Sequence, residues 1–262
     1  MSTEVKTPNP IEVCVDDWVM SITINRPEKK NAINQAMYNT MRLALVDADE
    51  RDDVCVIVIY GAGECFTAGN DLADFNSRKS TGLSKAGEFL LALHDLKKPL
   101  IAAVAGLAVG IGTTLLLHCD LVYAAKDARF RLPFVNLGLC PEAGSSLILP
   151  AISGHRAASE LLLLGDFFDV ETAINNGLVN RAVPADQLLN VVFERAQQLA
   201  QQPVQALLET KRLLKSGHYE QTKQRILDES EVFGHLLQND ESKAARQHAM
   251  GGHRHVDSES NN

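Results

Sequence analysis

The sequence lacks the features that mark several large classes of protein. Among its 262 residues, 25 lysines and arginines face 33 aspartates and glutamates, so the formal net charge is −8, and no basic run stands out. Because nucleic acids are bound by clustered cations, we expect no nucleic-acid partner. Hydrophobic residues make up 45% and charged residues 22% of the chain, which is typical of a globular protein and not of a disordered or fibrous one.

Cysteine and histidine patterns that hold metal ions are missing as well. The eight histidines form no His-x-x-x-His pair, and a Gly-x-Ser-x-Gly nucleophile elbow is absent. An odd number of cysteines, scattered through apolar segments, is typical of a reducing compartment. No two of them are spaced as Cys-x-x-Cys, so we expect no metal site. The five are Cys14, Cys55, Cys65, Cys119 and Cys140.

No targeting or membrane signal stands out. The first ten residues are polar, and the final Ser-Glu-Ser-Asn-Asn is neither a peroxisomal nor an ER address, so we expect a cytoplasmic protein. The uncharged run 99–117 is long enough to resemble a membrane span. It contains Pro99, Gly106, Gly110 and Gly112, so we interpret it as a buried strand, a glycine turn and a helix start. We therefore expect no membrane association.

Apolar, β-branched runs alternate with amphipathic segments. Short connections between them predict an α/β fold with helices packed on a mainly parallel sheet. Beyond residue 154 helices dominate, and we expect the residues from 251 onward to be frayed. Expected strands are 11–15, 19–24, 54–60, 100–105, 120–124 and 179–183. Expected helices are 34–50, 83–96, 110–118, 155–164, 170–176, 185–202, 204–215 and 219–238.

Three glycine-bearing loops are candidates for chemistry. In loop 61–72, Phe66 stands where a dinucleotide fingerprint has its third glycine, which disfavours a Rossmann site. Loop 105–114 opens a helix whose free N–H groups could stabilise an oxyanion, and Thr113 follows the glycines in place of a P-loop lysine. Loop 136–146 places Glu142 in apolar surroundings, where a carboxylate is often only a first-turn helix residue.

Five segments together resemble the crotonase (enoyl-CoA hydratase/isomerase) superfamily. The resemblance implies a crotonase-like spiral of repeated β-β-α units over residues 1–200 and a C-terminal helical oligomerisation region over 201–262. It also implies a homotrimer or a hexamer. The segments are Asn25-Arg-Pro-Glu-Lys-Lys-Asn-Ala-Ile, Phe66-Thr-Ala-Gly-Asn-Asp-Leu, Pro99-Leu-Ile-Ala-Ala-Val-Ala-Gly-Leu-Ala-Val-Gly-Ile-Gly, Cys119-Asp-Leu-Val-Tyr-Ala and Phe134-Val-Asn-Leu-Gly-Leu.

The resemblance implies an acyl-CoA thioester as substrate, with coenzyme A as part of that substrate and no further cofactor. The family holds the thioester carbonyl in an oxyanion hole of two backbone N–H groups, and the matching positions are Asn70 and Ile111. Removing a proton beside a thioester places negative charge on the carbonyl oxygen, and one preorganised N–H donor contributes about 3–4 kcal/mol to stabilising it. Ala68, Asn70 and Leu72 would line the path of the adenine and pantetheine.

The catalytic base separates the subclasses of this family. Hydratases use two glutamates to split water, and the matching positions here are Thr114 and Phe134. Glu142 instead matches the single glutamate of peroxisomal-type Δ3,Δ2-enoyl-CoA isomerases, and one carboxylate suffices to carry a proton from C2 to C4. We therefore expect an isomerase of fatty acid β-oxidation, with the pKa of Glu142 raised by burial against Leu139 and the acyl chain.

Further substrate contacts and other activities stay open from the sequence. Lys30 is a candidate for the CoA phosphates or a solvated loop charge, and Phe75 is a candidate for the acyl pocket or the core. The alternative activities are enoyl-CoA hydratase, an isomerase of aromatic acyl-CoA, and a non-catalytic acyl-CoA binder.

Overall fold

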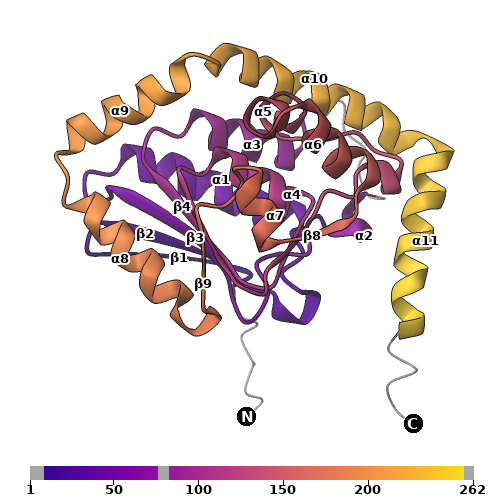
Figure 1. Cartoon of the computed structure of the whole chain (residues 1–262), viewed down its shortest axis with the longest axis horizontal. Helices are drawn as coiled ribbons and strands as arrows, with labels where there is room; N and C mark the ends of the chain where they lie inside the picture. The colour runs from indigo at the N-terminus through magenta and orange to yellow at the C-terminus, as the bar shows by residue number, and fades with distance from the viewer. Residues whose placement is uncertain (1–8, 76–82, 257–262) are drawn as a thin grey trace, which may run out of the picture.

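A six-stranded sheet forms the centre of the protein in a computed structural model that describes residues 9–75 and 83–256 (Figure 1). Phe75 and residues 250–256 are described in their backbone only. The strand order is β1-β2-β3-β4-β6-β9, with β1 and β2 antiparallel and every other neighbouring pair parallel. The bounds are β1 (Ile11–Asp16), β2 (Val19–Ile24), β3 (Val56–Gly61), β4 (Leu100–Val104), β6 (Leu121–Ala125) and β9 (Arg181–Val183).

The sheet contains all six strands expected from the sequence, and local residue chemistry explains them. Asp17 and Trp18 join β1 to β2 with φ angles of 45° and 66°, the backbone of a two-residue hairpin turn. β3 and β4 are continuous apolar runs because both faces of the sheet are covered; Val56 and Ile57, which point to opposite faces, are both 0% exposed.

A second, three-stranded sheet has the order β5-β7-β8 and was not predicted, because each strand is too short to show a pattern. Gly106 joins β4 to β5 with a φ of 55°, and a Cβ at this position would lie 2.0 Å from the carbonyl oxygen of Glu64. Only glycine fits this approach. The bounds are β5 (Leu107–Val109), β7 (Arg129–Arg131) and β8 (Phe167–Asp169).

Helices cover both faces of the large sheet. α8 packs against β2, β3, β4 and β6, whereas α1 packs against β1 and β2 and carries α3 on its outer side, so that α8 and α1 lie on opposite sides (Figure 1). The side chains of Asn34 and Ser84 cap α1 and α3 at their N-termini. These helices are α1 (Gln35–Glu50), α3 (Lys85–Asp95) and α8 (Leu188–Ala200).

Shorter helices connect the strands. Residues 110–118, expected as one helix, form the α-helix α4 (Ile111–Thr114) and the 3-10 helix η2 (Leu115–His118). The other α-helices are α2 (Leu72–Phe75), α5 (Ser145–Ser153), α6 (His155–Ser159) and α7 (Val170–Asn175). The remaining short segments are the 3-10 helices η1 (Pro27–Lys29), η3 (Val135–Leu137) and η5 (Ala185–Gln187) and the π-helical η4 (Glu160–Leu164).

The C-terminal helices form an arc along one side of the molecule (Figure 1). α9 (Val204–Ser216) and α10 (Tyr219–Gln238) agree with the expected helices, and α10 packs on α3 and α5. α11 (Asp240–Val256) was not predicted, and the fraying expected from residue 251 is wrong up to residue 256. Oligomerisation through residues 201–262 stays a prediction.

The uncharged run 99–117 forms β4, β5, α4 and the first part of η2 inside the protein, as the glycines and the proline indicated. Within the two described ranges, no helix has both the length and the hydropathy needed to cross a bilayer.

Candidate active site

Two of the three candidate loops lie against each other. The N–H group of Thr67 donates to the carbonyl oxygen of Leu107 at 2.9 Å, and that of Val109 donates to the carbonyl oxygen of Thr67 at 3.1 Å. Gly69 has a φ of 92°, and a Cβ there would lie 2.6 Å from the carbonyl oxygen of Val109. A side chain at this position would force the loops apart, so the contact depends on glycine.

This contact leaves the backbone N–H groups of Asn70 and Ile111 without an acceptor in the described part of the chain. The Ile33 N–H donates to the carbonyl oxygen of Gly69 at 2.8 Å, and the Ile33 carbonyl oxygen accepts from the N–H of Asp71 at 2.9 Å. These two bonds form a parallel β-bridge between Ile33 and Asn70 that does not use the Asn70 N–H. Ile111 begins α4, and the first N–H groups of a helix have no partner within it. Both predicted oxyanion donors are therefore available in adjoining loops.

A buried tyrosine of α1 fixes the side chain of Asn70. The Tyr38 hydroxyl donates to Asn70 Oδ1 at 2.6 Å, and the Tyr38 ring contacts Phe89 with 5.6 Å between the ring centroids. Burial, followed by the negative charges of Glu142 and Asp74, raises the pKa of Tyr38 well above its usual value. The hydroxyl thus keeps its proton and remains a donor. Sequence reasoning missed Tyr38, which looked like one more core position of an amphipathic helix.

Glu142 lies on the turn before α5 and is only 6% exposed. Its Oε1 is buried and has no hydrogen-bond partner among the described residues, and the same holds for the hydroxyl of Thr114. Burial, followed by the negative charge of Glu229, raises the pKa of the Glu142 carboxyl from 4.5 to about 8. An unpaired buried polar atom is destabilising, which favours a chemical role over a structural one. With this pKa the group can both accept and release a proton near neutral pH.

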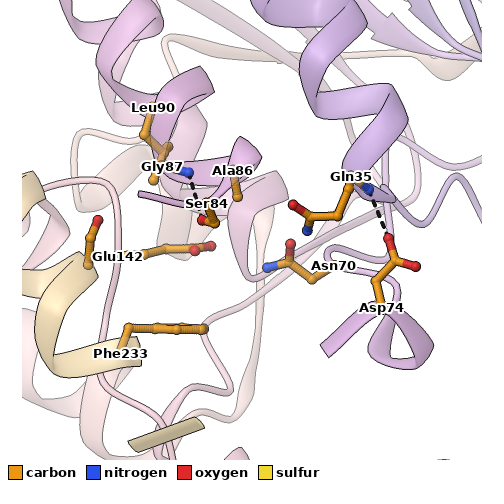
Figure 2. A pocket seen from close by; sticks show the side chains of 10 residues that line it. Gln35, Asn70, Asp74, Ser84, Ala86, Gly87, Leu90, Glu142 and Phe233 are labelled. Carbon is orange, nitrogen blue, oxygen red and sulfur yellow. Dashed lines mark hydrogen bonds between the residues drawn. The ribbon is translucent and has the colours of Figure 1, made fainter. Parts of the chain in front are cut away.

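A pocket brings Glu142 and Asn70 together (Figure 2). The Glu142 side chain extends into the pocket from one side, with Phe233 beside it, and the Asn70 amide extends from the opposite side. Two backbone N–H groups at the rim are satisfied: Gln35 donates to Asp74 at 2.8 Å, and Gly87 donates to Ser84 at 3.1 Å. Sequence analysis had not assigned eight of the lining residues to a site: Gln35, Asp74, Ser84, Ala86, Gly87, Leu90, Ser230 and Phe233.

Most of these missed residues belong to three helices that are distant in the sequence. α1 contributes Gln35, α3 contributes the face with Gly87 and Leu90, and α10 contributes Ser230 and Phe233. The apolar spacing of each helix indicated a buried face. It carried no signal for which part of that face meets the pocket, because this depends on how the helices pack.

The other predicted substrate contacts are not brought into this pocket. Lys30 is exposed, and its carbonyl oxygen accepts from the Ala68 N–H at 2.9 Å, which ties the Lys30 loop to the loop of Asn70. Ala68 and Leu72 are partly buried, and Leu139 is in the core at 4% exposure. None of these four lines the pocket.

Phe75 and Ile111 complete the predicted set. The Phe75 side chain lies outside the described residues. The Ile111 side chain is 0% exposed and belongs to the core, so only its N–H group can serve the site. Thr114 and Phe134, at the positions of the hydratase glutamates, are 1% and 4% exposed and carry no carboxylate. In the part of the chain that the structure describes, no three His, Cys, Asp or Glu side chains gather in a way that could hold a metal ion.

Comparisons with known proteins identify the family of the chain. A family model described as enoyl-CoA hydratase/isomerase matches residues 16–257. The chain is 38% identical to enoyl-CoA delta isomerase 2 of Rattus norvegicus, over 80% of this chain and 55% of that protein. It is 34% identical to 1,2-epoxyphenylacetyl-CoA isomerase of Escherichia coli (strain K12), over 72% of this chain and 75% of that protein. It is 30% identical to short-chain-enoyl-CoA hydratase of Clostridium acetobutylicum, over 87% of this chain and 89% of that protein.

Length and structure add to these matches. The chain spans only 55% of the length of enoyl-CoA delta isomerase 2 from rat, and the same share of the protein of that name from Homo sapiens. The solved structure of Pseudomonas aeruginosa OdaA superposes with a TM-score of 0.90 and 42% identity, covering 92% of this chain and 98% of that one. The fold is therefore the crotonase fold, and the chain belongs to the enoyl-CoA hydratase/isomerase family.

Proposed function

We propose that this protein is a Δ3,Δ2-enoyl-CoA isomerase that acts in fatty acid β-oxidation. The observation that carries the proposal is Glu142, a buried carboxyl group with an unpaired oxygen and a pKa raised to about 8, facing Asn70 across the pocket. The similarity to enoyl-CoA delta isomerase 2 supports it.

The reaction follows from the charges at the site. Glu142, in its ionised form, takes a proton from C2 of a 3-enoyl thioester. The electron pair moves onto the thioester oxygen, and the N–H groups of Asn70 and Ile111 stabilise the resulting enolate by about 3 kcal/mol each. Glu142 then returns the proton at C4 and the double bond comes to lie between C2 and C3. One proton leaves and one returns, so neither water nor a redox partner is consumed.

Hydration fits the same residues less well. It requires a second group that activates water, and Thr114 and Phe134 stand where a hydratase would carry its glutamates. Because hydratases are among the relatives, hydration is the second candidate. The isomerase proposal predicts that crotonyl-CoA is hydrated far more slowly than 3-enoyl-CoA is isomerised.

The direct test incubates the protein with 3-enoyl-CoA of several chain lengths and follows the absorbance of the conjugated 2-enoyl product. Parallel incubations with crotonyl-CoA and with an aromatic epoxyacyl-CoA measure the competing activities. Robust hydration without isomerisation would make the protein a hydratase, and turnover of the aromatic thioester alone would make it an aromatic acyl-CoA isomerase. Tight binding of CoA without any turnover would identify a non-catalytic binder.

Further properties belong to this proposal. Lys30 contacts the CoA phosphates, Ala68 and Leu72 line the pantetheine path, and no cofactor beyond the CoA of the substrate is needed. The protein assembles as a homotrimer or hexamer in the cytoplasm. Sedimentation measures the assembly, and Lys30→Ala is expected to raise KM without lowering kcat.

A further inference from the structure

The turn that carries Glu142 has an uncommon backbone. Ala143 and Gly144, the next two residues, have φ angles of 66° and 70°, and Ala143 is one of few non-glycine residues of the described chain in this left-handed region. An L-residue adopts this conformation only where its surroundings enforce it. The groups that hold this turn therefore decide where the Glu142 carboxyl points.

A glutamate of α10 holds the turn from its C-terminal side. Glu229 is 6% exposed, and its two carboxylate oxygens accept hydrogen bonds from the N–H groups of Gly144 at 2.6 Å and of Ser146 at 2.9 Å. It thereby satisfies two of the free N–H groups at the start of α5. Arg225, one turn earlier on α10, donates to the Ser146 hydroxyl at 3.1 Å.

A histidine holds the same turn from the opposite direction. His118 Nε2 lies 2.7 Å from the carbonyl oxygen of Ala143. Burial lowers the pKa of His118 to about 3, so the ring is neutral. Because a carbonyl oxygen only accepts, Nε2 carries the proton and donates. Glu229 and His118 thus hold the N–H and the C=O of the same peptide group, the one that joins the left-handed residues Ala143 and Gly144.

We propose that Glu229 is a positioning residue for Glu142, acting through the backbone of the turn and through its negative charge. This inference rests on the proposed role of Glu142 as the proton carrier. Glu229 comes from the same helix that places Ser230 and Phe233 in the pocket. A residue far along the chain, in the region first expected to serve oligomerisation, thereby acts on the catalytic group.

The negative charge of Glu229 raises the pKa of Glu142. A second negative charge disfavours ionisation of Glu142, so the proton stays on Glu142 to a higher pH than burial alone would require. Burial raises the pKa of Glu229 itself, and the N–H donors of Ser146 and Gly144 and the charge of Arg225 oppose that shift.

Apart from Glu229, His118 and Arg225, three titratable side chains near Glu142 make no hydrogen bond to its turn among the described residues. Tyr38 of α1 has a raised pKa and stays neutral. Cys140, two residues before Glu142, also has its pKa raised, to about 11, and stays a thiol. Asp74 of α2 lines the same pocket and bonds to the N–H of Gln35.

Three variants test the proposal. Glu229→Gln removes the charge and keeps one acceptor oxygen, Glu229→Asp keeps the charge on a shorter side chain, and Glu231→Gln is the matched control. Glu231 lies on the same helix with 78% of its side chain exposed. Thermal unfolding comes first, to establish that each variant is folded. Difference infrared spectra then follow the protonated carboxyl band of Glu142 with pH, assigned by its loss in Glu142→Gln.

The expected result has two parts. In Glu229→Gln the titration midpoint of Glu142 falls by roughly one pH unit. At pH 9, where Glu142 is largely ionised in both proteins, kcat falls about tenfold while KM changes little, because the carboxylate is a weaker base and the turn is held by one acceptor oxygen instead of two. In Glu229→Asp the midpoint stays near that of the parent, and kcat falls because the turn is held less well. Glu231→Gln behaves as the parent in every measurement.

An unchanged midpoint and an unchanged kcat in Glu229→Gln would overturn the proposal, even if the variant were less thermostable. If Glu229→Gln does not fold, Glu229→Asp decides, and a parental kcat would contradict the inference. The infrared titration needs no turnover. A shifted midpoint in a protein without isomerase activity would therefore keep the electrostatic coupling and reject the proposed function.

Discussion

The N–H groups of Asn70 and Ile111, the proposed oxyanion donors, lie in two adjoining loops, and the carboxyl group of Glu142 extends into the pocket from the side opposite the Asn70 amide (Figure 2). The loops 67–70 and 107–112, here called the strand-side wall, are held by backbone hydrogen bonds and by glycines that permit close approach. The turn 142–146 with α10, here called the helix-side wall, is held by side chains, His118 and, more than 80 residues further along the chain, Glu229.

This difference has chemical consequences. Backbone N–H groups do not titrate, so the strand-side wall offers the same donors at every pH. The helix-side wall carries a carboxyl group whose pKa depends on burial and on a neighbouring charge. The N–H donors of the strand-side wall change position only if the backbone moves. The pKa of Glu142 in the helix-side wall changes when a single neighbouring side chain is substituted.

The largest expected effect is on the helix-side wall. Glu142→Gln keeps the shape of the side chain and removes the proton carrier, so kcat for isomerisation is expected to fall by about 10³-fold or more. Calorimetric affinity for CoA should change little. Parental turnover in this variant would remove Glu142 from the mechanism.

The strand-side wall is tested next by Gly69→Ala. The new Cβ would meet the carbonyl oxygen of Val109 at 2.6 Å and the φ of 92° is unfavourable for alanine, so the loop that carries Asn70 must shift. We expect kcat to fall about 10²-fold and the free energy of unfolding to fall by about 1–3 kcal/mol.

Gly234→Ala is the matched control for that variant. Gly234 lies inside α10, and a Cβ there meets nothing within 4 Å. Chemical denaturation should show a gain of about 0.5–1 kcal/mol with parental kcat. Equal falls in kcat and in the free energy of unfolding in both glycine variants would contradict the special role of Gly69.

The pH dependence separates the walls without a structural change. With a Glu142 pKa of about 8, the ionised fraction and therefore kcat/KM should rise about tenfold between pH 7 and pH 9. The strand-side donors add no titration of their own in this range. Rates measured in buffers of constant ionic strength check this, and a flat profile would show that Glu142 is not the base.

The same shift has a stability consequence with a definite sign. The pKa of Glu142 is about 8 in the folded protein and near 4.5 in the unfolded chain, so the unfolded chain releases its proton first as the pH rises. The free energy of unfolding should therefore decline from about pH 4.5 to pH 8. Glu142→Gln should remove part of this decline, which urea titrations at several pH values would reveal.

The smallest expected effect concerns the anchor of the strand-side wall. Tyr38→Phe removes the hydrogen bond to Asn70 Oδ1, so kcat should fall several-fold and stability should fall by about 1 kcal/mol. Tyr60→Phe is the control, because the Tyr60 hydroxyl has no hydrogen bond among the described residues and its ring contacts Phe193. If kcat and stability fall equally in both variants, the hydrogen bond between Tyr38 and Asn70 has no specific effect on the reaction.

Much of the fold could be predicted because it depends on local patterns. The buried strand β3 and the Asn34-capped helix α1 were both expected within two residues of their bounds. The small sheet was missed because three-residue strands carry no periodicity. α11 was missed because its polar composition indicated a frayed end, whereas in the structure it packs against α10 and η3.

The site could be predicted to a lesser extent. Asn70 and Glu142 stand in loops with a recognisable order of residues, and both line the pocket. Lys30, Ala68, Leu72 and Leu139 do not, and their substrate contacts remain predictions. Tyr38, Phe233 and Glu229 were not singled out, since each is an ordinary member of its own helix.

The sequence by itself determined the α/β alternation, the glycines that allow the strand-side loops to touch, and a glutamate in an apolar turn. These depend on residues close together in the chain, where backbone geometry and side-chain type act directly. Only the tertiary structure decided that Glu142 is buried with an unpaired oxygen, that Tyr38 anchors Asn70, and that Glu229 holds the turn. Burial and charge coupling depend on which helices meet, and that is a property of the packed molecule.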